Sequence, residues 1–255
     1  MKPTTYPHIN SLLNELFLRI QEVFGNKLVG LYLEGSLVFG DFNEKISDID
    51  LLAVLSSDVT DQEFVQIKKM HEDFVKKHPK WDDEIEVCYI STNALMSIKS
   101  RTSPIVNISP GEPIHKMESS KEWIMNWYLA REKSATLFGP SLKTIIEPIS
   151  KEEYIQSVKD HVKSWSEWVK HMKDRYAQVA YTVLTMCRAL YAVRNGDQVS
   201  KKQAARWVQG EFPEWSDLIA DALVWRETKN EERPSEEVCV KMTEFVNFVR
   251  GEILE

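Results

Sequence analysis

The 255-residue sequence has few cysteines and no regular spacing of metal-binding side chains. Its three cysteines, Cys88, Cys187 and Cys239, are far apart and form no C-x-x-C pair. Such a sparse, odd set is typical of a reducing compartment, where cysteines serve as small core residues. The six histidines show neither H-x-H nor H-x-x-x-H spacing, so a zinc enzyme is not expected.

Long apolar runs and an excess of basic residues are also missing. No apolar segment approaches the ~20 residues that a membrane span requires. The first ten residues contain no charged region followed by an apolar stretch, so we expect a cytoplasmic protein with no membrane partner. The formal net charge is −7, whereas a protein that grips nucleic acid usually has a basic face. A small cationic partner is therefore mildly favoured over nucleic acid.

The two halves of the chain follow different patterns. In the first half, helical and strand patterns alternate, which indicates an α/β or α+β domain. The expected elements are a helix over 12–23, a strand over 28–33, a strand over 49–55, a helix over 61–78 and a strand over 85–90. Residues 91–117 look irregular because three prolines interrupt them, and a helix is expected from about Ser119 towards Gly139.

From Lys151 onward the spacing is helical throughout and predicts a bundle of about five helices. These are expected over residues 154–173, 177–194, 201–209, 215–227 and 236–254. The change of pattern near Pro148 predicts two domains, 1–148 and 149–255.

The segment from Leu33 to Leu52 contains the most informative motif. Gly35 and Ser36 directly follow a strand, and a tight turn there would let the backbone approach a ligand closely. If a helix begins at this point, its free N–H groups and the Ser36 hydroxyl would face an anion such as a triphosphate.

Three carboxylates near strand starts predict a metal site. Asp48 and Asp50 are two residues apart at the start of a strand, so their side chains project from the same face. A hard divalent cation would relieve their repulsion, and Mg²⁺ prefers one or two carboxylates together with substrate phosphates. Glu86 shares a strand face with Cys88 and Ile90, where a charge is costly unless it is paired or metal-bound. The alternative for Glu86 is an edge-strand residue that faces water.

Together, these parts resemble the catalytic domain of the nucleotidyltransferase superfamily that includes DNA polymerase β. A strand leads into Gly35-Ser36, eleven residues follow, and a D-x-D-L-L sequence from Asp48 then enters a second strand. The resemblance implies an α+β fold, with a mixed sheet in the N-terminal domain and a helical bundle after it.

Most of the chain is similar to one family, the adenylyltransferases that act on the aminoglycosides spectinomycin and streptomycin. The similarity includes Ser47 and the acidic motif after it, and it continues through the segments 130–134, 137–140, 183–188 and 204–207. It implies transfer of AMP from ATP to a hydroxyl of a small molecule, with Mg²⁺ held by Asp48 and Asp50.

The same resemblance implies roles for further residues. Glu86 falls where the family places its catalytic base. Nucleotide contacts are implied for Gly35, Ser36, Ser47, Arg188 and Lys201, with ATP between the two domains. A monomer is expected.

One departure leaves the acceptor open. Aminoglycoside-modifying members carry an acidic run before the V-L-T helix, whereas this chain has the uncharged segment Gln178–Tyr181. The same chemistry on a lincosamide or a metabolite is therefore an alternative. A non-catalytic, antitoxin-like module and a nucleic-acid-modifying transferase are further alternatives. The complete helical half argues against the first of these, and the acidic charge balance against the second.

Overall fold

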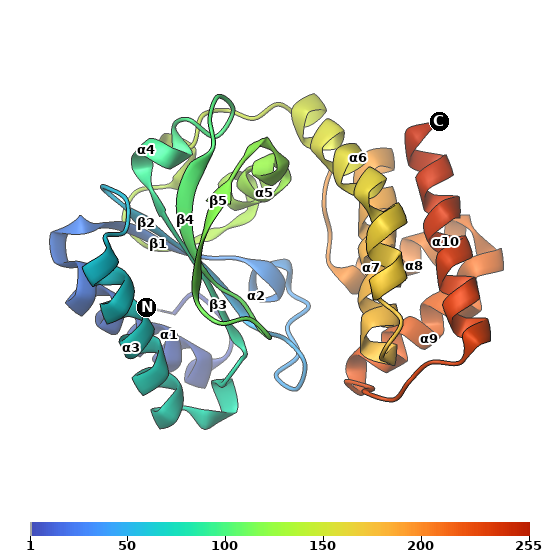
Figure 1. Cartoon of the computed structure of the whole chain (residues 1–255), viewed down its shortest axis with the longest axis horizontal. Coiled ribbons are helices and arrows are strands. Elements are labelled where there is room, and N and C mark those ends of the chain that lie inside the picture. The colour runs from blue at the N-terminus through green and yellow to red at the C-terminus, as the bar shows by residue number, and fades with distance from the viewer. Residues whose placement is uncertain (1) are drawn as a thin grey trace. The chain divides into compact units, whose positions relative to one another are not determined.

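The computed structural model in Figure 1 describes residues 2–255. The chain divides into two compact units. The first comprises residues up to 42 together with 47–149, and the second comprises residues 43–46 together with 150–255. The first unit contains a β-sheet covered by helices, and the second is built from helices.

The sheet of the first unit has six strands in the order β5-β4-β3-β2-β1-β6. The strands are β1 (Leu28–Leu33), β2 (Ile49–Leu55), β3 (Ile85–Ser91), β4 (Ser103–Ile108), β5 (His115–Ser119) and β6 (Ala135–Phe138). Among these strands, β2 and β3 pair in parallel and the other neighbours pair antiparallel. The sheet is therefore mixed, as expected.

Two long helices, α1 (Pro7–Phe24) and α3 (Asp61–Lys77), cover one face of the sheet (Figure 1). The buried residues of α1 recur every three or four positions, which is the spacing of one helix face. A capping box begins α3, in which Thr60 and Glu63 exchange side-chain-to-backbone hydrogen bonds. Alternate strand residues such as Leu51 and Val87 point into this core.

The opposite face of the sheet is covered by α4 (Thr92–Leu95) and α5 (Ile124–Lys133). Tyr32 lies fully buried there, and its hydroxyl donates a hydrogen bond to the carbonyl oxygen of Pro140 at 2.7 Å. The face that α4 and α5 cover carries the candidate site. The short helix α2 (Gly35–Phe39) follows β1, and its residues Leu37 and Val38 pack against the cluster on the opposite side of the sheet.

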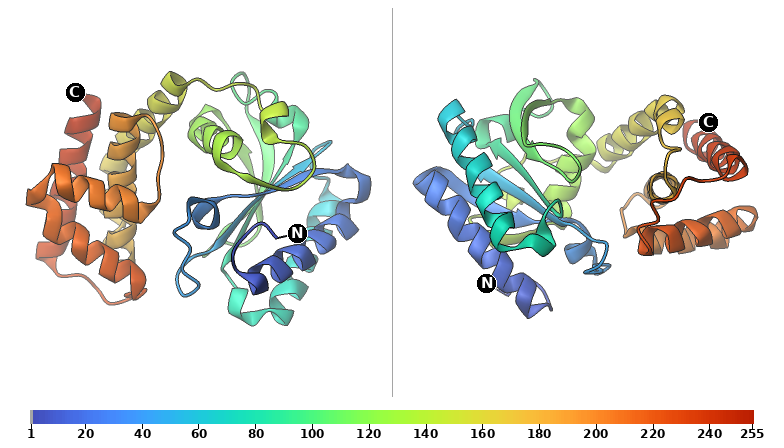
Figure 2. Two further views of the ribbon diagram at one scale, coloured as in Figure 1. Left: turned by 180° about the vertical axis from the view of Figure 1, so that it is seen from behind. Right: turned by 60° about the horizontal axis from the view of Figure 1, so that its bottom comes forward.

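The second unit packs four helices around α7. Its helices are α6 (Lys151–Trp168), α7 (Tyr176–Asn195), α8 (Lys201–Glu211), α9 (Ser216–Glu227) and α10 (Glu236–Leu254). The buried residues of α7 extend around most of its circumference, because α7 contacts each of the other four helices. Figure 2 shows these helices from two further directions. Among the described residues, no helix is long and apolar enough to cross a bilayer.

The structure confirms the expected α+β class. The three predicted strands correspond to β1, β2 and β3, and the five helices predicted after Lys151 are all present.

Two predictions about the middle of the chain were wrong. Residues 91–117, expected to be irregular, contain α4 and most of the β4–β5 hairpin. Pro104 is compatible with β4 because pairing with β3 begins only at Val106, so the missing N–H interrupts no bond to β3.

The helix expected to run to Gly139 ends at Lys133, and β6 follows it. Gly139 has a positive φ of 86°, and a Cβ atom at this position would overlap the carbonyl oxygen of Val29 in β1. Close packing against β1 therefore favours an extended strand over a continued helix.

Candidate metal centre

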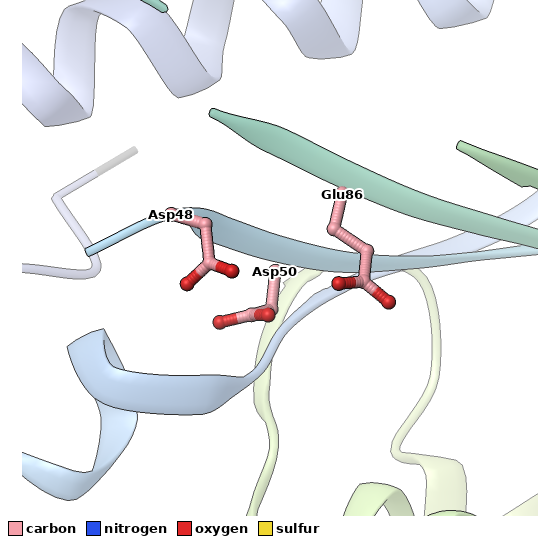
Figure 3. Close-up of side chains that lie close together, drawn as sticks. All are labelled: Asp48, Asp50 and Glu86. Carbon is pink, nitrogen blue, oxygen red and sulfur yellow. The ribbon is translucent and has the colours of Figure 1, made fainter. Parts of the chain in front are cut away.

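The acidic residues predicted from the motif converge where the two central strands of the sheet, β2 and β3, begin (Figure 3). Asp48 immediately precedes β2, Asp50 lies in β2, and Glu86 lies in β3 directly opposite Asp50. One carboxylate oxygen from each residue lies within 4.8 Å of the others, and all three residues are half-buried. The parallel register of β2 and β3 thus brings together carboxylates that are 36 positions apart.

This arrangement suits a hard divalent cation. Three carboxylates at this spacing repel one another, and oxygen ligands of this kind are those that Mg²⁺ and Ca²⁺ prefer. Gly35 has a positive φ of 62°, and a Cβ atom there would overlap the carboxylate of Asp50. The absence of a side chain at Gly35 therefore leaves room for the Asp50 carboxylate beside Asp48 and Glu86.

The predicted nucleotide-binding residues of the first unit adjoin these carboxylates. A helix does begin at Gly35, as predicted, although α2 has only five residues. The hydroxyl oxygen of Ser36 is buried and has no hydrogen-bond partner among the described residues. Ser47 is also buried and directly precedes Asp48.

A fourth carboxyl group, which the sequence analysis did not single out, lies beside the three. Glu34 follows β1, and its N–H donates a hydrogen bond to the carbonyl oxygen of Asp50 at 2.9 Å. Burial, followed by the negative charges of Asp50 and Glu86, raises the pKa of Glu34 to about 8. Sequence reasoning missed Glu34 because the pairing of β1 with β2 is known only from the structure. Given that pairing, alternation along the chain places Glu34 on the same face of the sheet as Asp50.

The raised pKa of Glu34 predicts that the metal-free protein loses stability as the pH rises. The folded state keeps the proton that the unfolded chain releases near pH 4.5, so stability falls between about pH 4.5 and pH 8. Because Glu34 is half-buried, we expect a loss of about 1–3 kcal/mol. Glu34→Gln should abolish this loss in urea unfolding with a chelator present. Exposed Glu72 provides the control, because Glu72→Gln should leave the pH dependence unchanged.

The two predicted residues of the second unit lie near one group of aromatic side chains. The Nζ atom of Lys201 is 5.1 Å from the ring centroid of Tyr181, and this ring lies 6.2 Å from that of Trp165. Trp165 donates a hydrogen bond from Nε1 to Nε2 of His161 at 3.0 Å. Burial, and then the positive charge of Arg188, lowers the pKa of His161. Arg188 and Lys201 therefore both adjoin this group.

Both parts of the chain match models of known protein families. A model of the nucleotidyltransferase domain matches residues 13–108, and a model of the C-terminal domain of aminoglycoside adenylyltransferase matches residues 144–252. Together, the two matches support an assignment to the aminoglycoside adenylyltransferase family. The first match includes Asp48, Asp50 and Glu86, and the second includes Arg188 and Lys201.

Individual members of the family are distant from this chain. An aminoglycoside (3'') (9) adenylyltransferase of Rhizobium radiobacter is 24% identical over 127 residues, which cover 49% of this chain and 45% of that protein. The match thus spans about half the length of that relative. A crystal structure of spectinomycin adenyltransferase AAD(9) from Enterococcus faecialis, with ATP and spectinomycin, is similar in fold, and the match covers 96% of this chain and 99% of that chain. Its TM-score is 0.74 at 18% identity, which shows a shared fold.

The start of α7 departs from the pattern that the family resemblance leads us to expect. The side-chain oxygen of Gln178 accepts a hydrogen bond from the N–H of Asp174 at 2.9 Å, so Gln178 stabilises the turn before the helix. Tyr181 lies one turn later, is 48% exposed, and packs against Trp165. Where the resemblance leads us to expect acidic side chains, this chain therefore presents an amide and an aromatic ring.

Proposed function

We propose that this protein transfers AMP from ATP to a hydroxyl group of a small molecule, with Mg²⁺ bound. The observation that carries the proposal is the convergence of Asp48, Asp50 and Glu86 within 4.8 Å, in a chain whose two parts match the two family models. A bound Mg²⁺ would neutralise the charge that develops on the transferred phosphate.

Each carboxylate has a proposed role. Asp48 and Asp50 hold the cation, and Glu86 accepts the proton of the acceptor hydroxyl. The hydroxyl oxygen forms a bond to the α-phosphorus of ATP, and the bond from that phosphorus to pyrophosphate breaks. Gly35, Ser36 and Ser47 adjoin the carboxylates in the chain, which supports their assignment to the triphosphate.

The class of acceptor follows from the family and from α7. The match of residues 144–252 to the C-terminal domain of aminoglycoside adenylyltransferase favours an aminoglycoside-type antibiotic. The uncharged segment Gln178–Tyr181 favours a second candidate, in which the same chemistry acts on a lincosamide or a hydroxylated metabolite.

The proposal is tested by measuring pyrophosphate release from ATP and Mg²⁺ with spectinomycin, streptomycin and a lincosamide as acceptors. Release that depends on one of these acceptors, together with a product heavier by one AMP, would support the transfer. No release with any of them would contradict the proposed acceptor class.

We further propose that Arg188 and Lys201 bind the phosphates of ATP, and we predict the effect of removing one charge. Lys201→Ala should weaken binding of a non-hydrolysable ATP analogue with Mg²⁺ by about ten-fold, or about 1.4 kcal/mol, because a cation beside a phosphate is lost. Calorimetric titration measures this affinity. The adjacent Lys202 is a matched control. It is also half-buried, and its Nζ atom lies 3.9 Å from Oε1 of Glu227. Equal affinities of Lys201→Ala and Lys202→Ala would remove Lys201 from the nucleotide site.

A further inference from the structure

One buried amide near the carboxylates has no visible hydrogen-bond partner. Asn107 lies in β4 and is 7% exposed. Its side-chain oxygen, Oδ1, is fully buried and accepts no hydrogen bond from the described residues. Because nearly all buried polar groups in folded proteins are hydrogen-bonded, such an amide calls for a partner that binds from outside the chain.

The strand register places Asn107 beside the proposed base. Asn107 lies directly opposite Cys88 in the antiparallel pair of β3 and β4. Cys88 and Glu86 point to the same face because they are two residues apart on β3. Asn107 is therefore a diagonal neighbour of Glu86 across the strand pair, a separation of roughly 7–8 Å between backbones that side chains readily bridge.

Electrostatics supports this placement. Burial, followed by the negative charges of Glu34 and Glu86, raises the pKa of the Cys88 thiol. The charges of Glu34 and Glu86 therefore act on Cys88, which is the residue directly opposite Asn107.

The neighbours of Asn107 do not supply the missing hydrogen bond. His115 is its cross-strand partner on β5, but Nδ1 of His115 lies 2.9 Å from the carbonyl oxygen of Pro113 and serves the turn of the hairpin. Ile105, two residues earlier on the same face of β4, is apolar. An apolar side chain at position 107 would therefore suit this surrounding better than an amide.

A second polar atom on this face is in the same situation. The Nε1 atom of Trp127 in α5 is buried and has no hydrogen-bond partner among the described residues. Trp127 packs in the same cluster as Cys88 and Ile105. Two unpaired polar atoms on the face that carries Glu86 are what a binding site for a polar molecule would contain.

We propose that Asn107 is an acceptor-binding residue and that its amide accepts a hydrogen bond from a second polar group of the acceptor. The inference rests on the proposed function, in which Glu86 takes a proton from a first hydroxyl. Because Asn107 and Glu86 are diagonal neighbours, the acceptor carries another hydroxyl or an amine within reach of Asn107 when its reacting hydroxyl lies at Glu86.

The test is Asn107→Leu, which fills a similar volume without a polar atom. The melting temperature of the protein without ligands should rise by about 2 °C or more, because an unpaired buried amide is removed. The KM for the panel acceptor that wild type uses best should rise about ten-fold, with kcat changed less than about three-fold. The affinity for Mg²⁺ and a non-hydrolysable ATP analogue should not change. Ile108→Val, on the opposite face of β4, is the matched control and should alter none of these binding values.

The outcomes separate the inference from the function on which it rests. An unchanged KM in an active Asn107→Leu variant would overturn the role of Asn107 and leave adenylyl transfer intact. A lowered melting temperature together with weakened nucleotide binding would show that Asn107 supports the fold instead. If wild type released no pyrophosphate with any acceptor of the panel, the proposed acceptor class would fail, and the role of Asn107 with it.

Discussion

Asp50→Asn is expected to reduce adenylyl transfer by about 10³-fold or more, which corresponds to about 4 kcal/mol of transition-state stabilisation. Asparagine preserves the size of the side chain but removes the charge that would hold the cation. Asp48→Asn should have an effect of the same order, because Asp48 is two residues before Asp50 and its carboxylate lies within 4.8 Å of that of Asp50. Pyrophosphate release at saturating ATP and varied Mg²⁺ measures both.

The same variants should not unfold the protein. Without Mg²⁺, Asp50→Asn should keep or raise the melting temperature, because it removes one of the charges that act on Glu34. Asp58 lies beyond the other end of β2 and is exposed, so Asp58→Asn is the matched control and should retain full activity. Near-native turnover by either Asp48→Asn or Asp50→Asn would rule out this metal site.

The apolar patterns of the sequence predicted those strands and helices whose position depends on neighbouring residues alone. β1, β2 and β3 are apolar runs with clear boundaries, and the helices after Lys151 have regular apolar spacing. β6 was missed because its four residues directly follow a helix, and its pairing with β1 is a contact between distant segments. The β4–β5 hairpin was missed because three prolines interrupt its sequence, although the residues that pair with β3 contain none.

The candidate site shows the same division. Asp48 and Asp50 could be predicted because their spacing alone places them on one face. Glu86 could be predicted because it shares a strand face with Cys88 and Ile90, and the family resemblance added its role as the base. Glu34 and Asn107 could not, because each joins the site through the order and register of strands. A lone glutamate after a strand and a lone asparagine within one are common features of surfaces. Only the pairing of β1 with β2, and of β4 with β3, brings these two residues to the acidic face.

Glu86→Gln is expected to slow transfer by roughly 10²–10⁴-fold while leaving the affinity for ATP and Mg²⁺ unchanged. Glutamine fills the same space and still accepts a hydrogen bond from the acceptor hydroxyl, but it cannot take up the proton. Single-turnover rates with the best acceptor of the panel, together with calorimetry on a non-hydrolysable ATP analogue, measure the two quantities separately. Glu118 in β5 is exposed, and Glu118→Gln serves as the matched control.

The geometry makes this variant decisive because Glu86 lies as close to the two aspartates as a third metal ligand would. If Glu86 binds the cation, Glu86→Gln should weaken nucleotide affinity and raise the Mg²⁺ concentration needed for half-maximal activity. If Glu86 is the base, the rate alone should fall, and the loss should be smaller at high pH, where the acceptor hydroxyl ionises more readily. A rate equal to that of wild type would show that Glu86 takes no part in the reaction.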